Sequence, residues 1–386
     1  MPEKFQFLMP MQIYFGENII QKIGEKTSAF GSRALIVAGA MAKNSGALQK
    51  VIHPLEKAGI EYVLFDKVEA QPRVPTIVEG AQLAREKKCE VVIGIGGECP
   101  MDAAKVMAAL AQDTVPISNY FGEDKIRNHP LPIITVPLTA GSGSEVTPFS
   151  AITTENDYLE IQTVVSSSIY PTLAFVDPQF TLAFPSAVTI ANGVDALSHS
   201  IEGIISKKSQ PLTDLLALES IRLVTMYLPK ALQEPQNLGY RSKLSYAALL
   251  GGMVIGQTGM GLVHHMGCHL TLDLGLKHGT ANGLLLPWVC EAALGRDRYK
   301  LPTIAKGLGA TISESTDEEI LEKVAEYIQR FISQIGLADE IKNKDLSHEK
   351  IKNYSARTLK HVESSLIGSC LVSKEEIEEI YRRALF

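Results

Sequence analysis

Residues 90–105, EVVIGIGGECPMDAAK, decide the fold. The stretch begins with the continuous apolar run of a buried strand, turns at Gly96-Gly97 and enters a helical pattern with Pro100 near its start. Glycines allow the backbone to approach a ligand, and a helix N-terminus offers free N–H groups to a phosphate. This order predicts the pyrophosphate-binding turn of an α/β domain. The alternative is a turn with a purely structural role, since two glycines before a helix often have one. Glu98 favours this alternative, because its carboxylate would repel a diphosphate.

The sequence on both sides of this stretch alternates short β-rich runs with helical patterns. Residues 34–37, 61–65 and 90–95 are largely continuous apolar runs, as expected for strands buried on both faces of a parallel sheet. Helical patterns at residues 47–58 and 75–88 separate them. Further strands are predicted at residues 131–136, 150–154 and 173–176. The alternation favours a parallel sheet of the nucleotide-binding type.

The character of the sequence changes near Pro185, after which β-branched runs become rare. Helices are predicted at residues 187–206, 211–228, 241–258, 316–335, 355–361 and 374–385. A length of 386 residues is typical of two domains. We therefore predict an α/β, Rossmann-like nucleotide-binding domain at residues 1–185 and an all-helical domain at residues 186–386.

The composition excludes several classes of protein. A net charge of −6 and the lack of a Lys/Arg-rich stripe argue against a nucleic-acid-binding protein. The five cysteines form no Cys-x-x-Cys pair, which indicates a reducing compartment. The N-terminus lacks the apolar run of a signal peptide, and every apolar stretch is too short to span a bilayer. We therefore expect a cytoplasmic protein that does not bind membranes.

A second loop, PLTAGSGSE at residues 137–145, follows the strand predicted at residues 131–136. The hydroxyls of Thr139, Ser142 and Ser144 are suited to donate hydrogen bonds to phosphates or to a nicotinamide amide. A tight turn with capping hydroxyls is an equally good explanation of the same residues.

Two clusters of metal-ligating residue types stand out in the helical half. Four of the nine histidines fall within fifteen residues: His264, His265, His269 and His278. Asp195 and His199 lie four apart in a helical pattern, so they share one face of that helix. Each cluster alone fits an ion pair or a core histidine. If they converge, His199, His264 and His278 with Asp195 make a site for a borderline divalent metal.

Four motifs, taken together, resemble the iron-containing, group III alcohol dehydrogenases. They are GGxxxxDxAK at residues 96–105, TAGSGSEVTPF at 139–149, NGVDALSHSIEG at 192–203, and GLVHHM with KHGTANGLLLP within 261–287. The resemblance covers nearly the whole chain. It implies a Rossmann-like domain followed by a helical one, the fold shared with glycerol dehydrogenases and dehydroquinate synthases. It also implies NAD(P)-dependent interconversion of small alcohols and aldehydes or ketones, usually by homodimers.

The resemblance also implies roles for individual residues. The four metal ligands of the family map onto Asp195, His199, His264 and His278. The family metal is typically Fe²⁺ and sometimes Zn²⁺, and three imidazoles with one carboxylate suit either ion. The cofactor-binding positions map onto Gly39, Gly96, Gly97, Glu98, Cys99, Asp102, Thr139, Ser142, Phe149 and Gln162.

The chain departs from the family pattern mainly on the cofactor side. Glu98 and Cys99 stand where the family usually has a third glycine and a serine, and Leu138 replaces one of two threonines. Gln162 lies at about the position of a lysine that often helps to bind the cofactor. These changes motivate an alternative from another class, a binding protein that has kept the metal site but lost hydride transfer. A glycerol dehydrogenase-like enzyme is a further alternative.

Gly39 follows a predicted strand at a position where NAD-preferring members tend to carry an aspartate. Because an aspartate would repel a 2′-phosphate and a glycine would not, we expect this chain to accept NADP(H).

Two further regions differ from the family near the reaction itself. Cys268 replaces a histidine near the nicotinamide, which leaves His265 and His269 as the predicted groups that pass the proton to solvent. Ile255 and Gln257 replace residues that are often Phe and Asn, so we expect a differently shaped substrate pocket.

Overall fold

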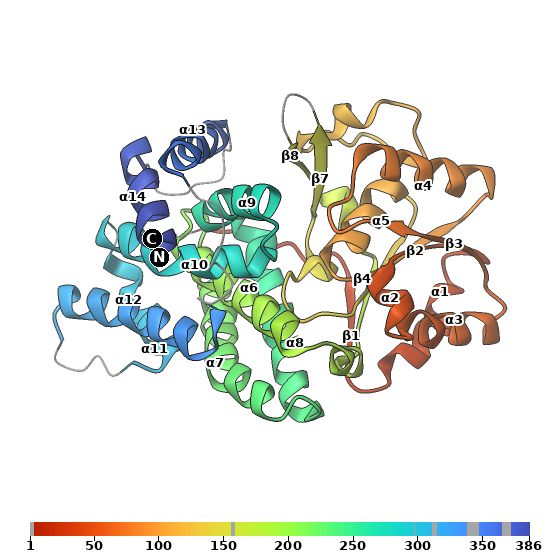
Figure 1. Cartoon of the computed structure of the whole chain (residues 1–386). Helices are drawn as coiled ribbons and strands as arrows, with labels where there is room; N and C mark the ends of the chain where they lie inside the picture. Colours follow the sequence, from red (N-terminus) through yellow and green to blue (C-terminus); the bar gives the residue numbers. More distant parts are fainter. Residues whose placement is uncertain (1–3, 156–158, 297, 311–314, 338–346, 365–371) are drawn as a thin grey trace. The chain divides into compact units, whose positions relative to one another are not determined.

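The computed structural model describes residues 4–155, 159–296, 298–310, 315–337, 347–364 and 372–386 (Figure 1). They form two compact units. The sheet unit comprises Met9–Thr139 and Gly143–Ala183. The helical unit comprises Phe184–Phe386 together with residues 4–8 and Ala140–Ser142. The main division thus follows Ala183, two residues before the boundary predicted at residue 185.

The sheet unit contains a six-stranded sheet whose pairings are all parallel, in the order β1-β9-β6-β4-β2-β3. The strands are β1 (Gln12–Phe15), β2 (Arg33–Gly39), β3 (Glu61–Val68), β4 (Val91–Gly96), β6 (Ile133–Pro137) and β9 (Leu173–Val176). Since β2 lies between β3 and β4, strand addition changes direction beside it. In open α/β sheets, ligands bind beyond the carboxyl ends of the strands at such a switch point.

Helices connect these strands and cover the sheet (Figure 1). They are α1 (Ile23–Thr27), α2 (Ala40–Asn44), α3 (Ala47–Lys57), α4 (Val74–Glu86) and α5 (Glu98–Leu110). Every residue of α5 from Pro100 to Leu110 is buried, because this helix packs on β2, β4 and β6 and is itself covered by α4. The polar residues of α5 beyond its first turn must therefore find partners inside the unit.

A second, three-stranded sheet in the order β5-β8-β7 completes the sheet unit. Its strands are β5 (Gly122–Glu123), β7 (Phe149–Glu155) and β8 (Leu159–Val165), with β7 and β8 antiparallel. Residues 150–154 form a strand as predicted, but this strand belongs to the second sheet and does not extend the parallel one.

One prediction about the parallel sheet is wrong. The strand predicted at residues 61–65 was expected to be buried on both faces, but β3 is the edge strand and its side chains alternate in exposure. Tyr62 and Leu64 are 36% and 37% exposed. An apolar run alone does not distinguish an edge strand from a central one.

The helical unit contains no β-strand in its described residues. Its α-helices are α6 (Ser186–Ile205), α7 (Pro211–Gln233), α8 (Leu238–Thr258), α9 (Leu262–Leu274), α10 (His278–Arg296), α11 (Leu301–Leu308), α12 (Asp317–Gln334), α13 (His348–Ser364) and α14 (Lys374–Leu385). The central helix is α6, which packs against α7, α8 and α10 (Figure 1). The histidine-rich segment forms α9 and the start of α10, and α9 ends at Gly275 in a left-handed conformation.

The structure bears on two expectations from the sequence, the absence of a disulfide framework and the absence of a membrane-spanning helix. Cys89, Cys99, Cys268 and Cys290 form no disulfide, whereas Cys370 lies outside the described residues. Across the described part of the chain, no single helix has the length and apolarity needed to cross a membrane. Helices α8 and α9 pass that test only as a pair, and they are bent by 111° at the break between them.

Candidate metal centre

Helix α6 places three ionisable side chains on one face in the core of the helical unit. Asp195, His199 and Glu202 follow one another at helical spacings of four and three residues. Their exposed fractions are 4%, 2% and 1%, respectively. Because a buried ionisable group is costly without a partner, this face requires compensating groups from other helices. Asp195 and His199 were predicted from the sequence as metal ligands, whereas Glu202 was not predicted to belong to the site.

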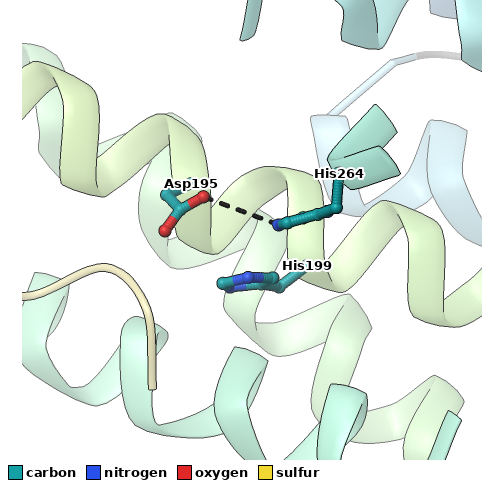
Figure 2. A group of neighbouring side chains, drawn as sticks. All are labelled: Asp195, His199 and His264. Atoms are coloured by element: carbon teal, nitrogen blue, oxygen red, sulfur yellow. Dashed lines mark ion pairs between the residues drawn. The ribbon is translucent and has the colours of Figure 1, made fainter. Parts of the chain in front are cut away.

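Helix α9 contributes the first of these groups, His264 (Figure 2). The potential ligand atoms of Asp195, His199 and His264 all lie within 4.8 Å of one another. The Nε2 atom of His264 is 3.6 Å from Oδ1 of Asp195. Its ring stacks on that of His199, with 4.6 Å between ring centroids and 13° between ring planes. Two segments more than sixty residues apart thus converge on one carboxylate, as their composition predicted.

Glu202 fixes the orientation of the His264 ring. Its carboxylate forms a very short contact with Nδ1 of His264. The same carboxylate accepts hydrogen bonds from the backbone N–H groups of Gly261 (3.2 Å) and Val263 (2.6 Å), at the start of α9. It therefore caps this helix and holds the imidazole so that Nε2 faces Asp195. Histidines that bind metals commonly have such a carboxylate on the other ring nitrogen.

His278, the first residue of α10, lies near the carboxylate of Asp195. Its Nε2 is 3.9 Å from Oδ1 of Asp195, and its ring centroid is 5.3 Å from that of His264. One turn later, Nδ2 of Asn282 donates to Oδ1 of Asp195 at 2.9 Å and lies 3.1 Å from Nε2 of His278. The four predicted ligands are therefore neighbours, with three in one tight group and His278 beside it. Asn282 was not identified from the sequence.

Glycines allow the helices to approach this closely. A Cβ atom on Gly279, next to His278, would lie 1.9 Å from the carbonyl oxygen of Ala191 on α6. A Cβ atom on Gly267 of α9 would lie 2.1 Å from Oδ1 of Asn282. Only glycine fits at these two contacts without a shift of the backbone or the side chain, so the glycines of the motif set the distances between the ligand-bearing helices.

The charges at the site are set by burial and by mutual contact. Burial lowers the pKa of His199 to about 4 and also lowers that of His278, so both rings are neutral at pH 7. Burial opposes the charged form of His264 as well, but the carboxylates of Glu202 and Asp195 outweigh it and raise its pKa to about 10. Burial would raise the pKa of Asp195, but the three imidazoles outweigh it and lower that pKa below its ordinary value.

The unpaired atoms of the group fit a metal ion. Among the described residues, Nδ1 of His199 and Nε2 of His264 are buried and have no hydrogen-bond partner. Buried nitrogen atoms of this kind are costly unless something else binds them. Imidazole nitrogens beside an ionised carboxylate are the donor set of Fe²⁺ and Zn²⁺ sites in proteins.

The two predicted proton-transfer histidines lie in different surroundings. His269 is 2% exposed, and its ring stacks on that of Tyr354 in α13 at 5.7 Å between centroids. His265 is half-buried and lies close enough to Glu202 to lower the pKa of that carboxyl. Neither belongs to the three-residue group, and their part in proton transfer stays a prediction.

The predicted pocket residues Ile255 and Gln257 make other contacts. Ile255 is 1% exposed in the core. The amide of Gln257 accepts from N–H of Leu8 at 2.9 Å and donates to its carbonyl at 2.8 Å. Gln257 therefore anchors the N-terminal segment on the helical unit, a role that its sequence position does not reveal.

In the sheet unit, several predicted cofactor residues gather at the carboxyl edge of the parallel sheet. Gly39 ends β2 and Gly96 ends β4, and the preceding residues of these two strands are paired with each other. Gly97 is the N-cap of α5, and Glu98 and Cys99 form its first turn. Oγ1 of Thr139 lies 3.5 Å from the point where a Cβ atom on Gly97 would be. These residues surround the switch point between β2 and β4.

The other predicted cofactor residues lie elsewhere. Asp102 is 3% exposed and bonded inside the fold, and Phe149 is 7% exposed at the start of β7. Gln162 is half-buried in β8 opposite Ile152, and Ser142 belongs to the helical unit. The sequence motifs therefore contain two kinds of residue, those that lie at the edge of the sheet and those, such as Asp102, that are bonded inside the fold.

Comparisons with known proteins agree with this architecture. The family model of the iron-containing alcohol dehydrogenases matches residues 10–178, and the model of the C-terminal domain of that family matches residues 189–385. The chain is 31% identical to 1,3-propanediol dehydrogenase of Klebsiella pneumoniae over 98% of both chains. It is 27% identical to the NAD-dependent methanol dehydrogenase of Bacillus methanolicus over 98% of this chain and 99% of that one. A crystal structure of a 1,3-propanediol oxidoreductase matches with a TM-score of 0.94 and 31% identity, over 99% of this chain and 100% of that chain.

Proposed function

The chain belongs to the iron-containing alcohol dehydrogenase family, and we propose that it interconverts a small alcohol and an aldehyde or ketone with NADP(H) as the preferred hydride carrier. The observation that carries this proposal is the buried group of Asp195, His199 and His264, whose ligand atoms lie within 4.8 Å of one another. A buried carboxylate beside imidazoles with unpaired nitrogens has little purpose in a helical core unless it binds an ion.

Asp195, His199 and His264 would hold the metal, with His278 as the fourth ligand. A bound Fe²⁺ or Zn²⁺ supplies Lewis acidity, which lowers the pKa of an alcohol hydroxyl or polarises a carbonyl. Glu202 holds His264 with Nε2 toward Asp195, and Asn282 holds the Asp195 carboxylate by a 2.9 Å hydrogen bond. These two contacts would orient His264 and Asp195 toward an ion, and the ion would displace the proton that His264 carries at pH 7.

The nicotinamide cofactor would lie at the carboxyl edge of the parallel sheet. Gly96, Gly97 and the N-terminus of α5 are suited to the pyrophosphate, since a helix N-terminus attracts anions. Gly39 at the end of β2 offers no carboxylate to repel a 2′-phosphate. The proposal therefore favours NADP(H) over NAD(H).

Fluorescence titration of the metal-loaded protein with NADPH and NADH tests the cofactor assignment. Micromolar binding, tighter for NADPH, is expected and would be followed by a screen of small alcohols and aldehydes. Tighter binding of NADH would overturn the NADP(H) preference. No binding of either would overturn the enzymatic proposal and favour a binding protein, in which Glu98 at the start of α5 repels the diphosphate.

Gly39→Asp tests the preference directly, with Gly39→Ala as its matched control. Any Cβ atom at this position would lie 2.8 Å from the carbonyl oxygen of Val68, so both variants share the same steric change. Only the aspartate adds negative charge. We expect the KM for NADPH to rise more in the aspartate variant than in the alanine variant, with little difference between them for NADH. Equal effects on NADPH would contradict the electrostatic argument.

The family resemblance implies the assembly of the protein, and the composition of the chain implies its location. We propose a homodimer in the cytoplasm, and light scattering of the purified protein tests the first part of this proposal. A monomer mass would contradict it.

A further inference from the structure

Lys105 is a fully buried lysine in the sheet unit, with an exposed fraction of 0%. It projects from the second half of α5 toward the segment that follows β6. Its Nζ donates to Oγ of Ser144 at 2.7 Å and to the carbonyl oxygen of Phe149 at 2.7 Å. Oγ1 of Thr147 and Oδ1 of Asp102 lie at 3.2 Å and 3.3 Å. One ammonium group thus gathers four oxygen atoms, three of them from residues 144–149.

Asp102, one turn before Lys105 on α5, also bonds to the segment after β6. Its Oδ1 accepts from the Ser144 hydroxyl at 2.5 Å, and its Oδ2 accepts from the backbone N–H of Ala151 at 2.7 Å. Its own carbonyl accepts from the Ser150 hydroxyl at 2.9 Å. Removal from water lowers the pKa of Lys105, and Asp102 opposes this effect by favouring the charged ammonium. Loss of either residue would therefore leave the charge of the other buried without its partner.

The bonds from Lys105 and Asp102 fix the distance between two loops at the edge of the sheet. One is the turn Gly96-Gly97 before α5, and the other is the loop that begins at Leu138 and Thr139. The second loop is bound at its start by the N–H of Leu138, which donates to the carbonyl of Gly96 at 2.7 Å. At its far end, Lys105 and Asp102 bind residues 144–151 to α5.

We propose that Lys105 is a positioning residue for the cofactor site. It holds the loop after β6 at a fixed distance from the N-terminus of α5 and does not touch the cofactor itself. This inference rests on the proposed use of a nicotinamide dinucleotide. On the second loop, Thr139 would be the group that contacts the cofactor, because its Oγ1 lies 3.5 Å from the point where a Cβ atom on Gly97 would be. Lys105 acts through Ser144 and the Phe149 carbonyl, so its loss would loosen the cofactor site and leave the metal centre unchanged.

Lys105→Met tests this role, because methionine fills the space of the lysine stem without its ammonium. The matched control is Lys300→Met in the helical unit, where Nζ of Lys300 bonds Ser209 at 2.7 Å and Asp214 at 2.6 Å. Both variants remove a lysine from a contact with one serine and one aspartate. Lys300 is less deeply buried and lacks the further contacts with a threonine and a carbonyl, but its contact does not support the cofactor loop.

The readouts are the Kd and KM for NADPH, the KM for the alcohol, the bound metal and the melting temperature. In Lys105→Met we expect the cofactor Kd and KM to rise about tenfold to a hundredfold, as the loss of a buried charge-assisted contact implies. The alcohol KM and the metal content should stay at the wild-type values. In Lys300→Met the cofactor constants should not change, even if the melting temperature falls.

Ser144→Ala keeps the test decisive if Lys105→Met does not fold. This variant leaves the Lys105–Asp102 pair in place and removes only the hydroxyl that links it to the loop. We expect a smaller rise in the cofactor Kd with a melting temperature close to that of the wild type. A wild-type cofactor Kd in a folded Lys105→Met or Ser144→Ala variant would overturn the inference. Failure of the wild-type protein itself to bind any nicotinamide would instead overturn the proposed function.

Discussion

Each unit contains a buried cluster of acidic and basic side chains, and these two clusters differ in how fully their atoms are paired. In the sheet unit, Lys105 and Asp102 are bonded to the oxygens and N–H groups of the loop after β6. In the helical unit, buried nitrogens of His199 and His264 lack a hydrogen-bond partner among the described residues. Since buried polar groups are normally paired, the first cluster has the character of a structural support and the second that of a binding site.

The difference shows that burial and charge alone do not identify a functional site. Both clusters combine acidic and basic groups that are nearly inaccessible to solvent. Among the described residues, Asp195, His199 and His264 in the helical unit form the one group of three metal-ligating side chains whose potential ligand atoms lie within 4.8 Å of one another. Substitutions in the two clusters should therefore remove different functions, metal binding in the helical unit and cofactor binding in the sheet unit.

His199→Ala should have the largest effect. It removes one ligand of the three-residue group, and we expect bound metal to fall below the detection limit and kcat/KM to fall roughly 1,000-fold. Metal analysis and steady-state kinetics measure the two losses. The cofactor Kd should stay unchanged, in contrast to Lys105→Met. Retention of stoichiometric metal in this variant would show that the ion binds elsewhere.

Gly279→Ala should distort the metal centre through the backbone. The new Cβ atom would lie 1.9 Å from the Ala191 carbonyl, so α10 must move away from α6 and carry His278 with it. We expect a stability loss of about 1–3 kcal/mol and weaker metal binding. The control is Gly295→Ala on the same helix, whose nearest neighbouring atom would be 4.0 Å away. Identical melting temperatures and metal affinities of the two variants would contradict this explanation.

Glu202→Gln should weaken metal binding without abolishing it. The substitution removes the charge that orients His264, and loss of such a partner typically costs about tenfold to a hundredfold in affinity. Competition with a chelator of known affinity measures the change. Glu219→Gln, which loses only a surface pair with Arg222, serves as the control and should bind metal like the wild type. Equal affinity of Glu202→Gln and the wild type would show that Glu202 serves only to cap α9.

Glu145→Gln should have the smallest effect, and one that depends on pH. Burial raises the pKa of Glu145 from 4.5 to about 7, so the folded protein keeps a proton that the unfolded chain has lost between these values. The contribution of this protonated carboxyl to the free energy of unfolding is complete below pH 4.5 and is lost as the pH rises through 7. Between pH 6 and 8, the wild type should lose about 1 kcal/mol relative to the variant, measured by urea unfolding. A constant difference between the two proteins over this range would contradict the pKa shift.

The patterns that predicted the fold and the metal centre are local ones. Asp195 and His199 lie four apart on one helix, and the alternation of strands and helices around residues 90–105 is regular. The fold class and the metal-ligand candidates could therefore be predicted from short stretches of the chain. The three-residue group then required only that α6 and α9 pack together, which their apolar composition favours.

The features that the sequence analysis missed depend on contacts between distant residues. Glu202 supports His264 only because α9 begins beside it, and Asn282 reaches Asp195 only because Gly279 brings α10 close to α6. Asp102 was assigned to the cofactor from its motif, but its carboxylate binds Ser144 and Ala151. No local pattern indicates on which side of α5 that carboxylate lies.

X-ray absorption spectroscopy of the Fe²⁺- or Zn²⁺-loaded protein tests the central claim, that Asp195, His199 and His264 with His278 bind the metal. We predict a first shell of nitrogen and oxygen atoms only, at about 2.0–2.2 Å for zinc, with outer-shell scattering from three imidazoles that decreases in His199→Ala. A sulfur ligand, or a shell of oxygen atoms without imidazole scattering, would contradict the account.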